Sequence, residues 1–390
     1  MVGQFPEKNS RNTSVVALGL DTTVTDYGWN SEEKCAEFPG SCWMPLMKFH
    51  LERQGFRVML SSEALALVEK GKLDVREVGL VHLDGESASQ ELLRLGCDAA
   101  LITQGESPIA IPDFYDRIAV TAQPFRQRIF FSGVRDWVTS EGQNDVLYFP
   151  AYSEARRQER LRHGDQGWSD RFSATGAEFL SFVGANNYWR RVGFSYYRWK
   201  PRKLLLAIED SPEGNYHRSA MRTQLHDTRL RAISYFSGKG EIAVYGRRWD
   251  QSPMPFGHRK RKILQAWQGP IETKSLALSS SKFNLCAENC SFPGYVTEKI
   301  FDAFIAGTVP IYFGAPNILD YVPHDSFING RDFSSFANLR KFLRSLTEDQ
   351  YRSYLSSATS FLASERGFRH TYEAFAQQVA GVFGAVAPKE

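Results

Sequence analysis

The chain has 390 residues, of which 42% are hydrophobic and 13% aromatic, and this length suits two domains of ordinary size better than one core. Lys and Arg total 47 against 44 for Asp and Glu, so the net charge of +3 lacks the strong basic bias of most nucleic-acid-binding proteins. Charged residues make up 23%, which argues against wholesale disorder. We therefore expect a globular protein with no nucleic-acid partner.

The cysteines form a sparse, odd-numbered set and do not predict a disulfide framework. They are Cys35, Cys42, Cys97, Cys286 and Cys290. Cys286 and Cys290 are close enough along the chain for a metal site, but no second pair of Cys or His residues lies nearby. Because tetrahedral zinc needs four ligands, we expect no metal here.

No run of about 18 apolar residues appears, so the sequence predicts no membrane-spanning helix. The polar N-terminal residues also lack the apolar region of a signal peptide, and we expect a soluble, cytoplasmic protein. Residues 188–203 mix aromatic and basic side chains. An interdomain linker is the favoured interpretation. The alternative is a surface that contacts an anionic membrane or a glycolipid head group, peripheral at the inner face of the cell membrane.

Short apolar, β-branched runs predict strands, and apolar residues at helical spacing that end at glycine predict helices. In the first half of the chain the expected strands are residues 14–20, 56–60, 98–103, 128–131 and 145–149, and the expected helices are residues 44–53, 64–70 and 90–95. Alternating strands and helices imply a mostly parallel sheet.

The second half of the chain repeats this alternation. The expected strands are residues 203–208, 241–245, 282–285 and 308–313, and the expected helices are residues 226–236, 297–306, 335–346 and 370–383. Two stacked, doubly wound α/β domains with a ligand cleft between them are therefore the predicted architecture.

The helix expected at residues 297–306 predicts an anion site at its start. Thr297 is a good N-cap, because its hydroxyl can accept a hydrogen bond from a helix N–H group. Apolar residues at helical spacing pack the helix on a sheet, and Gly307 ends it. The first turn therefore offers unpaired N–H groups and a partial positive charge, to which Lys299 adds a full charge.

Three further polar residues are expected near the same point, namely Asn289, Tyr295 and Glu298. Because Glu298 is a carboxylate beside an anion site, it is better suited to ribose hydroxyls than to phosphate oxygens. The alternative is purely structural, with Glu298 complementing the helix dipole and Lys299 solvated.

The motifs of this segment resemble those of the α-1,3/4-fucosyltransferases, glycosyltransferase family ten, in their bacterial form. They are Phe283-Asn-Leu-Cys-Ala-Glu-Asn289, Tyr295-Val-Thr-Glu-Lys299, Val309-Pro-Ile-Tyr-Phe-Gly-Ala-Pro-Asn317, Ser326-Phe-Ile328 and Asp332-Phe333, in the family's order. The clear resemblance covers residues 282–333, extends weakly back to about residue 203 and is faint before that.

The resemblance implies an α/β GT-B fold, with two Rossmann-like domains that face each other across a cleft. Residues 1–195 would bind the acceptor, residues 196–365 would bind GDP-fucose, and residues 366–390 would form a C-terminal helix. It also implies that Asn289, Tyr295, Glu298 and Lys299 contact the nucleotide-sugar, with Lys299 on the diphosphate. GDP-fucose would be a co-substrate, and no cofactor is obligatory.

A second cation is expected to assist the departure of GDP, because negative charge builds on the β-phosphate oxygen. The sequence has no Asp-x-Asp metal clamp, which favours Arg and Lys in this role. Arg229 fits the family's spacing best and Arg231 is its competitor, and either residue could instead be a solvated helix side chain. Arg247 is a further candidate for a phosphate or base contact. Residues 258–262 are strongly basic and are interpreted as a solvated loop rather than a cover over the nucleotide.

Inversion at the anomeric carbon needs one general base on the acceptor hydroxyl. Glu106 is the first candidate, because it follows an expected strand and lies in a Gly-Glu…Ser-Pro element that resembles the family's proposed base site. The alternative is a loop carboxylate that caps the next turn. Glu288 is the second candidate, although its place beside a buried strand better suits an organiser of the site.

We therefore expect an inverting α-1,3-fucosyltransferase that acts on an N-acetylglucosamine or glucose unit of a surface glycan such as lipopolysaccharide, with an oligosaccharide or glycolipid as acceptor. The alternatives are a transferase of another nucleotide-sugar on the same fold and a non-catalytic glycan-binding module. Trp43, Trp137 and Trp168 could stack on sugar rings, but core packing is the favoured interpretation for each.

Overall fold

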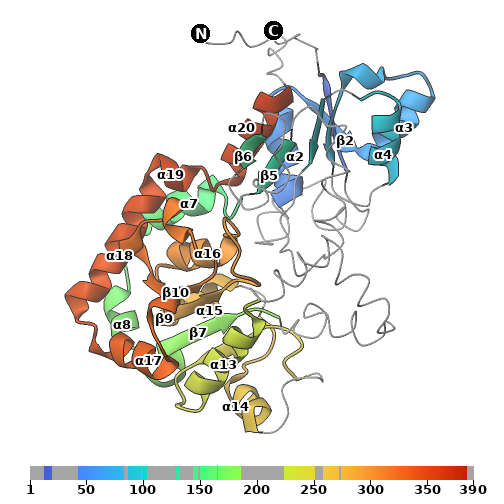
Figure 1. Cartoon of the computed structure of the whole chain (residues 1–390). Coiled ribbons are helices and arrows are strands. Elements are labelled where there is room, and N and C mark those ends of the chain that lie inside the picture. Colours follow the sequence, from blue (N-terminus) through green and yellow to red (C-terminus); the bar gives the residue numbers. More distant parts are fainter. Residues whose placement is uncertain are drawn as a thin grey trace, which may run out of the picture. The chain divides into compact units, whose positions relative to one another are not determined.

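The computed structural model describes residues 13–19, 43–82, 87–97, 99–102, 128–131, 144–147, 150–164, 166–185, 224–250, 258–271 and 274–383. They form two compact units, drawn in Figure 1. The described residues up to Leu147 belong to the first unit together with residues 372–383, and the described residues from 150 to 371 form the second. Each unit contains a parallel sheet with helices, so the expected α/β class and the two Rossmann-like sheets of a GT-B fold are confirmed.

The first unit is built on a four-stranded parallel sheet with the order β2-β1-β3-β4. Its strands are β1 (Val15–Leu18), β2 (Arg57–Leu60), β3 (Val78–His82) and β4 (Ala99–Ile102), and a separate parallel pair is formed by β5 (Arg128–Phe131) and β6 (Asn144–Leu147). All four residues of β1 are buried, as is usual for a central parallel strand. The sequence did not predict β3, which has only five residues, contains Gly79 and ends at the polar His82.

The C-terminal helix belongs to the first unit. The unit's helices are α2 (Trp43–Arg53), α3 (Ser61–Glu69), α4 (Ser87–Arg94) and α20 (Tyr372–Phe383), and α20 packs beside α2 (Figure 1). Nε2 of His50 on α2 lies 3.5 Å from Oε1 of Glu373 on α20. A Cβ atom at Gly79 of β3 would lie 2.6 Å from the ring of Phe383, so this glycine is what lets the helix approach the sheet. We expected residues 366–390 to form a separate C-terminal helix. In the structure the helix is α20, and it belongs to the first unit.

The second unit contains a five-stranded parallel sheet with the order β11-β10-β9-β7-β8. Its strands are β7 (Leu180–Val183), β8 (Ala243–Tyr245), β9 (Phe283–Ala287), β10 (Val309–Phe313) and β11 (Ile328–Asn329). The chain moves from β7 to one side of the sheet and returns to add β9 on the other side. The strand order therefore reverses between β7 and β9, and such a reversal is where doubly wound sheets bind ligands.

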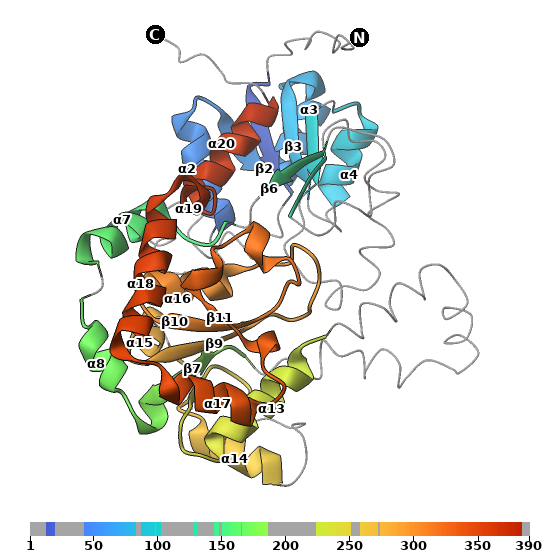
Figure 2. The ribbon, with the colours of Figure 1, turned by 60° about the vertical axis from the view of Figure 1, so that its left-hand side comes forward.

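Helices cover both faces of this second sheet (Figure 2). They are α7 (Glu154–His163), α8 (Trp168–Ser173), α13 (His226–Ser237), α14 (His258–Ala266), α15 (Lys274–Ser279), α16 (Glu298–Ala306), α17 (Phe336–Ser345), α18 (Glu348–Ala363) and α19 (Glu365–Phe368). Successive residues of β9 enter different cores: Leu285 packs with residues of α13 and α17, and Cys286 packs with residues of α16 and α18. The expected loop at residues 258–262 is wrong, because the chain there begins α14.

Two buried arginines on α7 tie this helix to the second unit. Arg157 donates from Nη2 to the carbonyl oxygen of Ala363 at 3.1 Å, and Arg160 donates from Nε to that of Phe304 at 3.1 Å. These carbonyls belong to the last turns of α18 and α16, where the regular helical pattern of hydrogen bonds ends. Phe304 O also accepts from Gly307 N at 3.1 Å. The domain boundary expected near residue 195 therefore lies close to residue 150. The strand expected at residues 203–208 lies outside the described residues, and β7 supplies a strand that the sequence did not predict.

No helix in the described part of the chain combines the length and the apolar character that are needed to cross a bilayer.

Candidate functional site

The residues that follow β9 occupy the point where the strand order of the second sheet reverses. Glu288 extends the β9–β10 pairing, because its N–H group donates to Phe313 O at 2.8 Å. Asn289 O accepts from Leu225 N at 2.9 Å, directly before α13, and α16 begins nine residues further along at Glu298. The carboxyl end of β9 therefore meets the first turns of two helices, where unpaired N–H groups concentrate.

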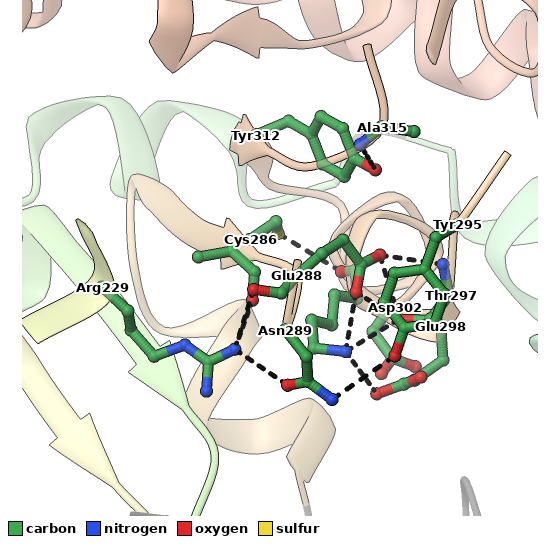
Figure 3. Close-up of polar contacts among 12 residues, drawn as sticks. Arg229, Cys286, Glu288, Asn289, Tyr295, Thr297, Glu298, Asp302, Tyr312 and Ala315 are labelled. Carbon is green, nitrogen blue, oxygen red and sulfur yellow. Dashed lines mark hydrogen bonds and ion pairs between the residues drawn. The ribbon is translucent and has the colours of Figure 1, made fainter. Parts of the chain in front are cut away.

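Glu288 is the centre of a buried polar network, shown in Figure 3. Its side chain has no exposed surface. Oε1 accepts from Thr297 N at 2.8 Å, and Oε2 accepts from the Thr297 hydroxyl at 2.7 Å and from Lys299 Nζ at 2.9 Å. Gly314 makes room for this carboxylate, since a Cβ atom there would lie 2.7 Å from Cγ of Glu288.

The expectation that the Thr297 hydroxyl caps α16 is wrong. Thr297 is the N-cap residue, but its side chain makes no capping hydrogen bond. The hydroxyl instead lies between the Glu288 carboxylate and Lys299 Nζ, which is 2.8 Å away. Charged partners form stronger hydrogen bonds than a neutral backbone N–H group, so the tertiary contact prevails over the local one.

Glu298 and Lys299 are charged neighbours at the start of α16, with Lys299 Nζ 3.6 Å from Glu298 Oε1. Burial raises the pKa of the Glu298 carboxyl, but the positive charges of Lys299 and Lys274 outweigh it and bring this pKa down to about 2. Burial lowers the pKa of Lys299, but the carboxylates of Glu288 and Glu298 reverse this and raise it. Both side chains are therefore ionised at neutral pH, and each remains partly exposed, at 26% and 21%.

Lys274, the first residue of α15, extends the charged cluster, and sequence analysis did not find it. Its ammonium donates to Asp302 of α16 and lies 3.9 Å from Glu298 Oε1. Asp302 also lies 3.9 Å from Nη1 of Arg156 on α7. Burial lowers the pKa of Lys274, but Asp302 and Glu298 raise it above its usual range. Lys274 precedes the motifs and is brought to them only by the packing of α15 on α16, so no local sequence signal marks it.

Arg229 reaches the same point from α13, and its side chain is almost completely buried. Nη2 donates to Ala287 O at 2.7 Å, to Glu288 O at 3.2 Å and to Asn289 Oδ1 at 3.3 Å. Asn289 in turn donates from Nδ2 to the Tyr295 hydroxyl at 3.3 Å. The structure therefore brings Arg229, Asn289, Tyr295 and Glu298 together around the end of β9 (Figure 3). Lys299 completes this cluster through its contacts with Glu288 and Glu298.

The other candidate residues differ in their placement. Arg231 lies away from the cluster, with 55% of its side chain exposed and Asp227 at 3.7 Å. Arg247 is exposed in the loop that follows β8, at the same edge of the sheet, but it makes no contact with the cluster among the described residues. Glu106 lies outside the described residues, so its role as the base stays a prediction. The same holds for Trp137 and for the side chains of Trp43 and Trp168.

The buried cysteines show no sign of a metal centre within the described ranges. Cys286 donates from Sγ to Lys299 O at 3.2 Å, and burial raises the pKa of this thiol above its usual range. No group of three or more His, Cys, Asp or Glu side chains among the described residues could hold a metal ion.

This arrangement suits a ligand that combines hydroxyl groups with phosphates. Lys299 offers a fixed ammonium beside the first turn of α16, where backbone N–H groups and the helix dipole favour anions. Glu298 offers an ionised carboxylate that can accept hydrogen bonds from hydroxyl groups. The two side chains are adjacent and partly exposed, so one ligand can contact both of them.

Comparison with known proteins gives a family match for the part of the chain that contains the cluster. Residues 216–377 match the family model of the C-terminal domain of glycosyltransferase family 10 (fucosyltransferase), and this range includes Arg229, Asn289, Tyr295, Glu298 and Lys299. An α-(1,4)-fucosyltransferase of Arabidopsis thaliana is 47% identical over 73 residues, which cover 19% of this chain and 18% of that protein. The α-(1,3)-fucosyltransferase FucT of Helicobacter pylori is 42% identical over 76 residues, which cover 20% of this chain and 16% of that protein.

The similarity to curated relatives is local. The mouse 4-galactosyl-N-acetylglucosaminide 3-α-L-fucosyltransferase 9 is 37% identical over 103 residues, which cover 25% of this chain and 29% of that protein. The matched stretches thus span less than a third of the length of any of these three relatives. Among solved structures, an α1,3-fucosyltransferase aligns with 98% of this chain and 93% of its own, at 16% identity and a TM-score of 0.44.

Proposed function

Because residues 216–377 match the C-terminal domain of glycosyltransferase family 10 (fucosyltransferase), we propose that this chain transfers L-fucose from GDP-fucose to a hydroxyl group of a glycan. The observation that carries the proposal is the pair Glu298 and Lys299. Both lie at the start of α16, both are ionised and partly exposed, and both belong to the family-matched domain. A nucleotide-sugar presents the hydroxyls and the diphosphate that such a pair can bind.

In this proposal Lys299 and the first turn of α16 bind the diphosphate, and Glu298 accepts hydrogen bonds from the ribose hydroxyls. Asn289 and Tyr295 complete the donor site beside them. Arg229 and Arg247 are the candidates for a further cation. As GDP leaves, charge builds on its β-phosphate oxygen, and cations that are already oriented stabilise that charge most effectively.

The transfer is a single displacement that inverts the anomeric carbon of fucose. The acceptor hydroxyl oxygen attacks that carbon while its proton passes to Glu106, the proposed base. The bond between the anomeric carbon and the β-phosphate oxygen breaks, and GDP leaves with the electron pair. No covalent intermediate and no cofactor is needed in this scheme.

We propose an α-1,3 linkage to an N-acetylglucosamine or glucose unit of an oligosaccharide or glycolipid. The names of the relatives support this acceptor class, since two of them carry a 3-linkage and one names an N-acetylglucosaminide. A bacterial surface glycan such as lipopolysaccharide, modified at the cytoplasmic face of the membrane, is the acceptor that we propose. The aromatic and basic composition of residues 188–203 supports a peripheral contact there.

The decisive experiment incubates the full chain with GDP-fucose and N-acetyllactosamine and follows the release of GDP. We expect turnover with this pair and a fucosylated product whose linkage NMR identifies. UDP-glucose and UDP-galactose serve as competing donors. Turnover with a UDP-sugar but none with GDP-fucose would refute the proposal in favour of another transferase, and binding of glycans without any turnover would favour a non-catalytic module.

A further inference from the structure

The Thr297 hydroxyl lies between an obligate acceptor and an obligate donor. It is 2.7 Å from Glu288 Oε2 and 2.8 Å from Lys299 Nζ. An ionised carboxylate only accepts hydrogen bonds, and an ammonium only donates them. The hydroxyl therefore donates its proton to Glu288 and accepts from Lys299, which fixes its orientation.

The two residues that hold Lys299 are themselves rigid. Glu288 is completely buried and is anchored through its N–H group to Phe313 O and through Oε1 to Thr297 N. Thr297 is 3% exposed and β-branched, so its side chain has little rotational freedom. Lys299 is different, because a long, partly exposed lysine loses much rotamer freedom when it is fixed.

We propose that Thr297 and Glu288 are positioning residues, which hold the Lys299 ammonium where it meets the diphosphate of the donor. This inference rests on the proposed function. A lysine that is ordered before the ligand arrives loses less entropy on binding, so the nucleotide is bound more tightly. With no exposed surface and both oxygens engaged, Glu288 cannot also accept a proton from the acceptor, which removes it as the second candidate for the base.

Thr297→Val tests the inference without changing any charge. Valine keeps the shape of threonine but can neither donate to Glu288 nor accept from Lys299, whereas Thr297→Ser keeps both hydrogen bonds. Calorimetry with GDP and with guanosine separates the diphosphate contribution from that of the nucleoside. We expect Thr297→Val to weaken GDP binding about tenfold, since a hydrogen bond to a charged group is lost, and to leave guanosine binding unchanged. Thr297→Ser should bind GDP within about twofold of the wild type, because it retains that bond.

Thr308→Val is the matched control for the loss of a buried threonine hydroxyl beside α16. Thr308 is 1% exposed and follows the end of this helix, and its hydroxyl accepts from Asn284 Nδ2 rather than contacting Lys299. We expect a lower Tm and an unchanged ratio of GDP affinity to guanosine affinity. In a Lys299→Met background, Thr297→Val should have no further effect on that ratio. Equal losses of GDP and guanosine affinity, or an unaltered GDP affinity in Thr297→Val, would overturn the inference.

A second measurement needs no nucleotide. Acetylation of the Lys299 amine in the ligand-free chain can be followed by mass spectrometry, with the exposed Lys341 as the internal reference. Release of the ammonium should make Lys299 react faster in Thr297→Val and at the wild-type rate in Thr297→Ser. Unchanged reactivity in Thr297→Val refutes the positioning, whether or not GDP binds. If Lys299 reacts faster in Thr297→Val than in the wild type, but the wild type does not bind GDP, only the proposed function is refuted.

Discussion

Two buried glutamates lie at opposite edges of the second sheet. Glu288 follows β9 at the carboxyl edge, and Glu241 precedes β8 at the amino edge. Glu241 is 3% exposed and accepts from Arg340 Nε at 2.6 Å and from Arg344 Nε at 3.0 Å, both on α17. Burial raises the pKa of Glu241, but the hydrogen bonds from these arginines outweigh it and lower the pKa.

The comparison shows that a buried ion pair does not by itself mark a functional site. Glu241 joins β8 to α17 through Arg340 and Arg344, which lie beyond the first turn of α17, so this ion pair does not involve the start of that helix. Glu288 instead meets the start of α16, where an anionic ligand can use backbone N–H groups beside the Lys299 ammonium. Exposure of the cations does not distinguish the two networks, since Lys299 is 21% exposed and Arg340 and Arg344 are 31% and 45% exposed. The position at the carboxyl edge, rather than burial or charge, separates the two networks.

The largest expected effect is a loss of turnover without a loss of nucleotide binding at the carboxyl edge. Glu106→Gln should lower kcat by about 10²–10⁴, because the acceptor hydroxyl loses its general base. The affinity for GDP should stay at the wild-type value, since the donor site is placed around β9 and α16. Turnover assays and calorimetry on the same preparation check both parts, and a kcat that barely changes would remove Glu106 as the base.

The next effect tests whether charge at the carboxyl edge binds the nucleotide. Lys299→Ala should weaken GDP binding by about 10²–10³, beyond the range of ordinary calorimetry, because a fixed charge on the diphosphate is lost. Arg344→Ala is the matched control, since it removes a cation that pairs with the other buried glutamate. Equal GDP affinities for Lys299→Ala and Arg344→Ala would contradict the proposal that the cation at the carboxyl edge binds the nucleotide.

Motif and periodicity together locate the donor site in the sequence. The apolar spacing predicted α16 to within one residue, and Asn289, Tyr295, Glu298 and Lys299 were expected near the start of that helix. The structure places these residues together where α16 begins beside the end of β9. Their roles toward a nucleotide stay predictions until binding is measured.

Other features depend on tertiary contacts that a local pattern does not show. The Thr297 hydroxyl has a local interpretation as a cap, but its contacts with Glu288, nine residues earlier, and with Lys299 override it. Arg157 shows the same limit, since an arginine-rich helix such as α7 is typical of a solvated surface. The structure buries Arg157 against the end of α18, more than 200 residues later in the chain, which also moves the domain boundary. No local pattern encodes such contacts.

A smaller effect concerns stability at the two edges. Glu241→Gln should lower the free energy of unfolding by about 1–3 kcal/mol, because charge-assisted hydrogen bonds to two arginines weaken, and should leave turnover unchanged well below the Tm. Glu288→Gln should lower both stability and turnover. Urea denaturation and GDP-release assays check these outcomes. If Glu241→Gln lost turnover at a temperature where it is fully folded, the purely structural role of Glu241 would be contradicted.

The smallest effect appears only in acid. The pKa of Glu298 is about 2, below its value in an unfolded chain, so its stabilising contribution is complete above the unfolded pKa and is lost as the pH falls through about 2. The pKa of Glu241 is lowered as well, so both edges lose stability in the same direction on acidification. Urea denaturation between about pH 2 and 5 should therefore show a flatter pH dependence for Glu298→Gln and for Glu241→Gln than for the wild type. If only Glu241→Gln flattened the pH dependence of stability, Lys299 and Lys274 would not hold the Glu298 carboxylate in its ionised form.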